Sequence, residues 1–344
     1  MTSTPNARVL FNSIPKDYPV PGETTVYDAS ETIDPENVDL KGGFLFKLLV
    51  LSVDPYMRGR MREPDVESYA PPFHIGQPLD GYGIGIVTRS ENSEVPKDRY
   101  VYGQVPYQQY TVFPKLNSEQ MWILETHPDV PLTAYLGPAG MPGQTAFCGW
   151  KEFSQAQAGQ VAFITTGAGA VGSVVVQLAK HDGLRVIASA GSDEKVEFLR
   201  SLGADVAFNY KTTDTREVLK QHGPIDVYWD NVGGETTDAA LEHTKNDARL
   251  IVCGAITGYN GAPQPITKWD QIFARTLHIH GLLVFALLPK YVAQFYETVP
   301  PLIAQGKIKY REDVTKGLDK VGEVILAVQK GGNTGKAVVV VAEE

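Results

Sequence analysis

Cysteine is scarce in this chain, which has only Cys148 and Cys253 among its 344 residues. Two cysteines do not make the disulfide framework of a small secreted domain, so we expect buried thiols and a cytoplasmic location. Signal-peptide patterns are missing at the N-terminus, and no apolar run reaches the roughly 18 residues of a membrane span. A basic surplus is also missing: the net charge of -9 argues against a nucleic-acid partner.

Clustered metal ligands are lacking as well. A catalytic zinc needs about three converging Cys, His or carboxylate ligands. His74, His127 and Cys148 form no such cluster, and His278 and His280 share one face of a strand without an evident third partner. We therefore interpret these histidines as core or interface residues and expect no metal ion.

The texture of the sequence changes near residue 131. Before it, short β-like runs follow one another, which is typical of a β-rich domain. After it, apolar strands alternate with amphipathic helices, which predicts a doubly wound parallel sheet. The tail returns to β-like texture at residues 336–342. We expect a β-rich domain over 1–130, completed by 307–344, and an α/β domain over 131–306.

Six strands are predicted in the α/β domain, the number of the dinucleotide-binding fold. They are Gln160–Thr165, Arg185–Ala190, Asp205–Tyr210, Ile225–Asn231, Arg249–Ala255 and Leu277–Phe285. Pro300 and Pro301 interrupt the helical pattern of residues 289–306, and because proline fits the first turn of a helix, we expect two helices there.

The first of these strands leads into GAGAVG, residues 167–172. The segment fits G-x-G-x-x-G in the setting that binds dinucleotides, between a strand and a helix. We expect Gly167 to permit a tight turn, Gly169 to let the backbone approach a pyrophosphate, and Gly172 to allow close helix packing. The helix start, with Ala170 and Val171, offers free N–H groups to the phosphates. A glycine-rich turn without a ligand is the alternative.

The end of the second strand indicates which dinucleotide binds. NAD-dependent enzymes place an acidic residue there, whereas residues 187–191 are small and uncharged. Ser192 and Lys195 follow in the next helix, and Tyr210 closes the third strand. A lysine and a phenol are suitable donors to a 2′-phosphate, although a solvated lysine and a strand-end aromatic remain alternatives. Together these features favour NADP(H).

Longer segments resemble a known family. The sequence is similar to the zinc-independent medium-chain dehydrogenase/reductases, in the branch of leukotriene B4 dehydrogenase, prostaglandin reductase and plant alkenal double-bond reductase. The resemblance runs from about residue 40 to the C-terminus. It is carried by LSVDPYMRGRM (51–61), MPGQTAF (141–147), TTGAGAVGSVVVQLAK (165–180), AGSDEKVEFLRSLGADVAFNYK (190–211), DNVGGE (230–235), CGAITGYN (253–260) and GNTGK (332–336).

The resemblance implies a GroES-like β domain, a Rossmann domain, a dimer, and reduction of the C=C bond of α,β-unsaturated ketones and aldehydes by NADPH. On the cofactor side it implies that Lys195 and Tyr210 contact the 2′-phosphate. It also implies further cofactor contacts, which are Asn231, Cys253, Tyr259, the backbone of Phe285 and, reaching over from the tail, Asn333.

On the substrate side the resemblance implies contacts from Tyr56, Arg58, Tyr82 and Met141. Residues 60–74 depart from the family pattern and are expected to shape the substrate pocket. For Tyr56 and Arg58 the alternative is a structural turn at a domain interface.

Hydride transfer to the β-carbon of an enone leaves negative charge on the carbonyl oxygen, and a donor there stabilises the enolate. We expect Tyr259 to be that donor, directly or through the cofactor ribose, with Tyr56 as the second candidate. Tyr259 could instead be an aromatic cover over the cofactor. The competing enzymes are a quinone reductase and an allylic alcohol dehydrogenase; the competing non-enzyme is an NADPH-binding sensor.

Overall fold

The structure is a computed structural model that describes residues 3–343. The chain divides into two compact units, which we describe separately. Unit 1 ends at Leu136 and resumes at Glu312, and unit 2 covers Gly137–Arg311. The first boundary lies beyond residue 130 because the 3-10 helix η1 (Leu132–Leu136) packs on strands of unit 1. The second boundary falls where strand β16 begins at Glu312.

Unit 2 contains a six-stranded parallel sheet with the strand order β12-β11-β10-β13-β14-β15. This is the 3-2-1-4-5-6 order of the dinucleotide-binding fold, so the predicted fold class is confirmed. The strands are β10 (Val161–Ile164), β11 (Arg185–Ala190), β12 (Val206–Asn209), β13 (Ile225–Asp230), β14 (Thr244–Val252) and β15 (His278–Gly281).

The central strands β10 and β13 of this sheet are buried on both faces, as expected for parallel strands covered by helices. Alternate residues of one strand enter different clusters: Phe163 packs in one core, and Ala162 and Ile164 pack in another. The helices of the unit are α2 (Met141–Phe153), α3 (Gly172–His181), α4 (Asp193–Ser201), α5 (Thr215–His222), α6 (Gly234–Glu242), α7 (Asp270–Ala274) and α8 (Val284–Ala304), with the 3-10 turn η2 (Ile256–Gly258).

Two predictions about the end of unit 2 are wrong. The sixth strand stops at Gly281, and Phe285 lies in the first turn of α8. The apolar run from Leu277 concealed this change, because strand and helix use the same apolar residues. Helix α8 also continues through Pro300 and Pro301. Each of them lacks the backbone N–H that would bond to the carbonyl four residues earlier, so the helix loses two bonds there, and it ends soon afterwards at Ala304.

Unit 1 is built on a seven-stranded sheet. Its order is β16-β17-β5-β6-β7-β9, and β8 pairs with β5. The strands are β5 (Phe44–Ser52), β6 (Asp80–Ser90), β7 (Tyr100–Pro106), β8 (Tyr110–Phe113), β9 (Met121–Ile123), β16 (Glu312–Lys316) and β17 (Lys336–Val340). Two hairpin-like pairs, β1 (Thr4–Pro5) with β4 (Thr32–Ile33) and β2 (Arg8–Phe11) with β3 (Thr25–Asp28), precede it.

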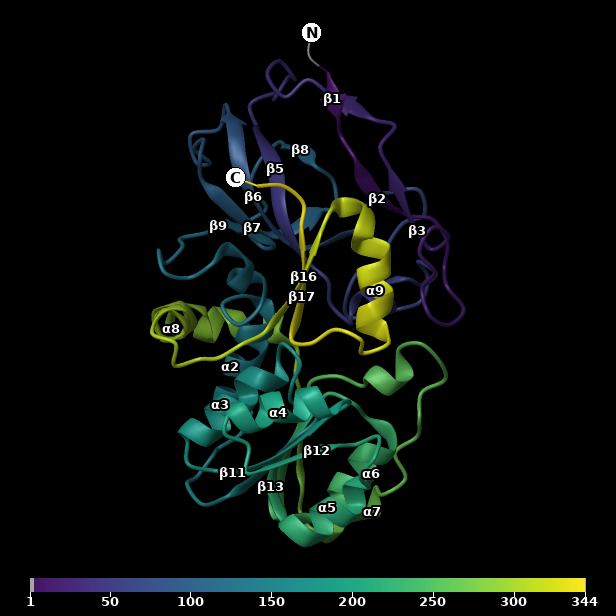
Figure 1. Cartoon of the computed structure of the whole chain (residues 1–344), viewed down its shortest axis with the longest axis vertical. Helices are drawn as coiled ribbons and strands as arrows, with labels where there is room; N and C mark the ends of the chain where they lie inside the picture. The colour runs from purple at the N-terminus through teal and green to yellow at the C-terminus, as the bar shows by residue number, and fades with distance from the viewer. Residues whose placement is uncertain (1–2, 344) are drawn as a thin grey trace. The chain divides into compact units, whose positions relative to one another are not determined.

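The tail is an integral part of unit 1. Strand β17 pairs antiparallel with β5, so that Val338 lies opposite Ser52. Helix α9 (Val321–Gln329) follows the 3-10 turn η3 (Leu318–Lys320) and packs near β17 and β3 (Figure 1). The short helix α1 (Met57–Arg60) follows β5 directly.

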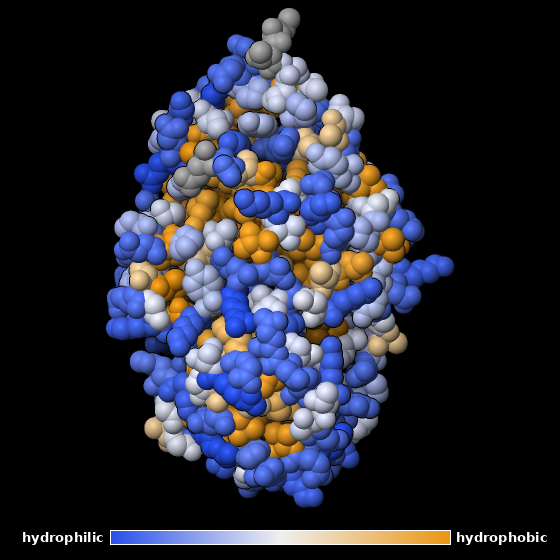
Figure 2. Space-filling model, in the orientation of Figure 1, coloured by the Kyte–Doolittle hydropathy of each residue, from blue (hydrophilic) through white to orange (hydrophobic). Residues whose placement is uncertain are grey.

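Among the described residues, none of the helices combines the length and the apolar character that crossing a bilayer requires. On the face shown in Figure 2, hydrophilic residues are spread widely, with smaller apolar patches between them. This is the usual mixture at a protein surface.

Candidate functional site

The glycine loop connects β10 to α3, as predicted. Its left-handed residue is Thr166, with φ of 50°, and not a glycine. Gly167 donates its N–H to the Ser189 carbonyl at 2.9 Å. A Cβ on Gly172 would lie 2.4 Å from the Thr166 carbonyl oxygen and 2.8 Å from the Gly167 Cα, so the helix start packs directly on the turn. Gly172 therefore has the packing role expected of it.

The middle of the loop is more open. A Cβ on Gly169 would meet only Thr166 atoms, the nearer at 3.2 Å. Ala170 and Val171 lead into α3, whose start has no capping side chain among the described residues. The Ser173 and Val174 N–H groups already donate to the Gly169 and Val171 carbonyls. The helix start therefore offers an anion the N–H groups that precede Ser173 and the positive end of its dipole.

The end of β11 is bordered by a phenol and an amine. A Cβ at Gly191 would lie 3.1 Å from the Tyr210 hydroxyl and 3.4 Å from the Lys211 Cε. Ser192 caps α4 and accepts the Lys195 N–H at 3.4 Å, which places Lys195 in the first helical turn beside this end. The structure thus brings together the predicted Ser192, Lys195 and Tyr210, and adds Lys211.

Two carboxylates in the same helical turn are already engaged. Glu194 forms an ion pair with Arg311 at 3.0 Å, and Asp193 accepts the Asn209 amide at 2.9 Å. These contacts partly offset their negative charge. The first turn of α4 therefore repels an anion less strongly than the two acidic residues in its sequence suggest.

Asp230 organises the turn after β13. Its Oδ1 accepts the N–H groups of Val232 at 2.8 Å and Gly233 at 2.9 Å. Asn231 uses its side chain locally: its amide donates to the Thr165 carbonyl at 2.7 Å and accepts from the Trp229 indole at 3.3 Å. Asn231 thus joins the ends of β10 and β13.

Cys253 and Tyr259 lie on the loop after β14. Burial, with a smaller contribution from the negative charge of Asp230, raises the pKa of the Cys253 thiol to about 12. Burial also raises the pKa of Tyr259, against a lowering contribution from the Ala255 backbone. Both groups are therefore protonated at neutral pH, and the Tyr259 hydroxyl remains a hydrogen-bond donor.

The other predicted contacts are scattered over both units. Phe285 is 49% exposed on the first turn of α8, and Met141 begins α2. Asn333 lies in unit 1, where its amide donates to the Gly335 carbonyl at 2.8 Å. Tyr82 is buried on β6 and stacks on Tyr102.

Tyr56 lies at the start of α1 in unit 1. Its hydroxyl is buried and has no hydrogen-bond partner among residues 3–343. Burial, followed by the charge of Asp54, raises its pKa well above the usual range, so it is a neutral donor. A buried donor without a partner costs about 1–3 kcal/mol, which a hydrogen-bonding ligand can recover.

The side chain of Arg58 forms hydrogen bonds within unit 1. Its guanidinium donates to the backbone carbonyls of Asp17 at 2.9 Å and Pro15 at 3.1 Å, so it holds the N-terminal segment against α1.

Comparisons with known proteins agree with this geometry. The family model described as zinc-binding dehydrogenase matches residues 170–303, and the one described as N-terminal domain of oxidoreductase matches residues 11–121. The chain is 38% identical to a zinc-type alcohol dehydrogenase-like protein of Schizosaccharomyces pombe, over 95% of each chain. It is 37% identical to the NADP(+)-dependent 2-alkenal reductase of Nicotiana tabacum, over 93% of this chain and 95% of that one.

This chain belongs to the medium-chain dehydrogenase/reductase family, in its zinc-independent alkenal and enone reductase branch. A solved structure agrees. CurA of Vibrio vulnificus in complex with NADPH superposes with a TM-score of 0.89 at 31% identity, covering 98% of this chain and 100% of that one. The predicted family and fold class are thus confirmed.

The residue types that usually bind metal ions, His, Cys, Asp and Glu, are dispersed in this protein. Within residues 3–343, no group of three or more His, Cys, Asp or Glu is placed to hold a metal ion. His280 stacks on Phe153 with ring centroids 4.7 Å apart, and burial lowers its pKa.

Sequence reasoning missed three charged residues of this reductase. Lys211 adjoins Tyr210 in the FNYK segment, which is the signal that could have revealed it. Arg60 is buried and forms a two-pronged ion pair with Asp80, both contacts at 2.8 Å, while its guanidinium lies 4.1 Å from the centre of the Phe73 ring. An arginine next to the predicted Tyr56 and Arg58 was the only sequence signal for that pair.

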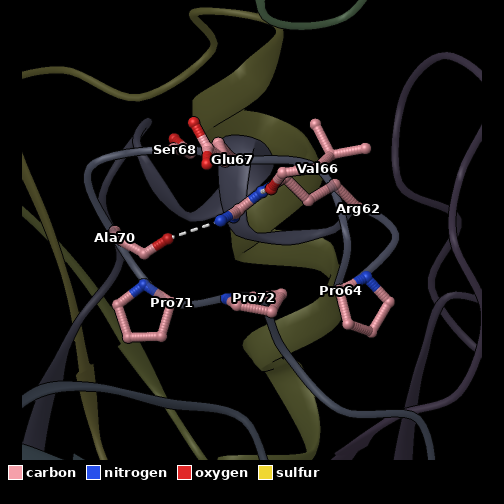
Figure 3. Close-up of a pocket in the computed structure, with 8 residues that line it drawn as sticks. All are labelled: Arg62, Pro64, Val66, Glu67, Ser68, Ala70, Pro71 and Pro72. Carbon is pink, nitrogen blue, oxygen red and sulfur yellow. Dashed lines mark hydrogen bonds between the residues drawn. The ribbon is translucent and has the colours of Figure 1, made fainter.

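The loop after α1 surrounds a surface hollow of about 600 Å³. Arg62 holds the loop closed by donating to the carbonyls of Val66, Gly59 and Ala70 at 2.7–2.9 Å. Figure 3 shows its hydrogen bond to Ala70. The residues that line the hollow all come from this loop. They are Arg62, Pro64, Val66, Glu67, Ser68, Ala70, Pro71 and Pro72. The hollow lies within residues 60–74, the segment that we expect to shape the substrate pocket.

Proposed function

We propose that this chain reduces the C=C bond of α,β-unsaturated aldehydes and ketones with NADPH. The observation that carries the proposal is its 37% identity to the tobacco 2-alkenal reductase over 93% of the chain. The test is NADPH oxidation with enals and enones of graded size, with product identification. A saturated carbonyl product is expected, and an unsaturated alcohol contradicts the proposal.

The cofactor residues present fit NADP(H). The backbone at Gly169 and the uncapped start of α3 suit a pyrophosphate. At the end of β11, where an NAD site would carry an acid, Tyr210 and Lys211 border Gly191. We assign the 2′-phosphate to Lys195, Tyr210 and Lys211.

Replacing Lys195 or Lys211 by methionine is expected to lower kcat/KM for NADPH about tenfold, the effect of one charge-assisted hydrogen bond at an exposed site. NADH lacks the 2′-phosphate, so its kcat/KM should stay unchanged. Steady-state kinetics with both cofactors measures this, and Lys220→Met on exposed α5 is the matched control. Equal losses with NADPH and NADH contradict the assignment.

Bound NADPH supplies the hydride for the β-carbon of the substrate. The protein stabilises the negative charge that develops on the carbonyl oxygen, and this requires a protonated donor. Tyr259 is our first candidate and Tyr56 our second, because their raised pKa values keep both hydroxyls protonated through the neutral range. A tyrosine or water then protonates the α-carbon.

Tyr259→Phe is expected to lower kcat for an enal by about ten- to hundredfold, which is at or below the lower end of the roughly hundred- to thousandfold loss typical of one oxyanion donor. The loss is moderate because positioning of the enone against the cofactor contributes much of the rate. Stopped-flow NADPH oxidation measures the hydride step. Full turnover by Tyr259→Phe shows that Tyr259 is not the donor.

The remaining residues keep supporting roles in this proposal. Asn231 and Cys253 shape the cofactor side through the turns after β13 and β14, where the Asn231 amide already binds Thr165. The other proposed contacts are Phe285 and Asn333 for the cofactor, and Arg58, Tyr82 and Met141 for the substrate. Alanine replacements read by KM for NADPH and for the enal distinguish the two groups.

The proposal extends to a cytoplasmic homodimer. Strand β15 ends the order of the parallel sheet, and edge strands offer unpaired backbone groups to a second copy. Ile279 in this strand, and Leu283 and Phe285 just after it, are 42–49% exposed. Light scattering should give twice the chain mass, and Ile279→Lys should halve it. Both cysteines are free thiols, which suits the cytoplasm, and cell fractionation tests that location.

A further inference from the structure

Two sequence motifs far apart in the chain meet inside unit 1. The Lys336 ammonium of GNTGK donates to the Asp54 carboxylate of DPYMR at 2.9 Å and to the Val53 carbonyl at 2.8 Å. The side chains of Lys336 and Asp54 are 2% and 7% exposed. The start of β17 is therefore bound to the turn that follows β5.

Further polar groups complete this buried pair. The Ser52 hydroxyl donates to the second oxygen of Asp54. Glu312, the register partner of Lys336 on β16, accepts the Thr133 hydroxyl at 2.9 Å. Burial lowers the pKa of Lys336, whereas the carboxylates of Asp54 and Glu312 raise it. Desolvation offsets most of the attraction within such a pair, so its best supported benefit is a defined arrangement.

The Lys336–Asp54 pair fixes the conformation of the turn that contains Tyr56. The Val53 N–H donates to the Ala337 carbonyl at 3.2 Å, and the Met57 N–H donates to the Asp54 carbonyl at 3.2 Å. Tyr56 therefore stands between two anchored residues. Its buried hydroxyl has no hydrogen-bond partner in the described part of the chain, and Asp54 is the strongest charge acting on it.

We propose that Lys336 and Asp54 are positioning residues, which fix the 53–57 turn so that the Tyr56 hydroxyl is held ready for the substrate carbonyl oxygen. The substrate in this statement rests on the proposed function, whereas the fixing of the turn does not.

The first test combines Lys336→Met with Asp54→Asn, so that neither charge stays buried alone. Tyr56→Phe should lower kcat/KM for an enal about tenfold in the intact protein, and less than about twofold once the pair is neutral. KM for NADPH should not change. Tyr259→Phe should cost the same factor in both backgrounds. Neutralising another ion pair of unit 1, by Arg8→Met with Asp28→Asn, should leave the Tyr56→Phe effect intact.

The second test is hydrogen–deuterium exchange, which needs no substrate. Neutralising the pair should speed exchange at Met57–Gly59 at least tenfold, while the β6–β7 amides stay protected. Unchanged exchange at the turn overturns the inference. So does a Tyr56→Phe effect of equal size in both backgrounds, or full activity of Tyr56→Phe. If the wild-type protein reduces no enal, the proposed function fails, and the exchange result still decides the inference.

Discussion

Lys336→Met alone is expected to lower the free energy of unfolding of unit 1 by about 3–5 kcal/mol, because Asp54 then remains as a buried carboxylate without its counter-ion. Urea unfolding followed by fluorescence measures the loss. Of the four tryptophans only Trp122 belongs to unit 1, so its signal should show the earlier transition.

The matched variant is Lys336→Met with Asp54→Asn. It leaves no charge unpaired at the turn, so it should recover most of the lost stability. A single variant as stable as the wild type would show that Asp54 is solvated or protonated in the folded chain. The charge of Asp54 would then have no structural role.

Gly172→Ala is expected to destabilise unit 2 by about 1–3 kcal/mol and to weaken NADPH binding at least tenfold. The added methyl group would lie 2.4 Å from the Thr166 carbonyl oxygen, so α3 must move away from the turn. Such a movement displaces the helix N–H groups that we assign to the pyrophosphate. Thermal unfolding and NADPH fluorescence titration measure the two effects.

Gly169→Ala is the matched comparison in the same loop. Its methyl group would meet only Thr166, no closer than 3.2 Å, so the fold should keep its stability to within about 0.5 kcal/mol. NADPH binding should still weaken, because this backbone is where the pyrophosphate approaches. If both variants lose the same stability, the two glycines do not have separate roles.

The sequence predicted the parallel sheet of unit 2 well because its strands are short apolar runs separated by helical patterns. QVAFIT and RVIASA became β10 and β11 almost unchanged. The prediction failed where apolar strands no longer alternate with amphipathic helices. Residues 277–288 are nearly all apolar, so the sequence does not show where β15 ends and α8 begins. Phe285 was therefore placed in a strand although it lies in a helix.

For the polar residues of the candidate site, too, the sequence predicted only those that a nearby motif indicates. The positions of Lys195 and Tyr210 near the end of β11 were predictable, because both residues follow the glycine loop within the next two strand–helix units. The Lys336–Asp54 pair spans 282 positions, and only the pairing of β17 with β5 brings its members together. Charged residues beside apolar runs are usually solvated, so nothing local indicated that these two are buried.

The most direct test of the proposed function follows the hydride itself. NADPH carrying deuterium at both C4 positions of the nicotinamide should transfer one deuteride to the β-carbon of 2-cyclohexen-1-one and give cyclohexanone labelled at C3. NMR and mass spectrometry of the product locate the label. Deuterium on the carbonyl carbon, in an allylic alcohol, would contradict C=C reduction and identify a carbonyl reductase on the same scaffold.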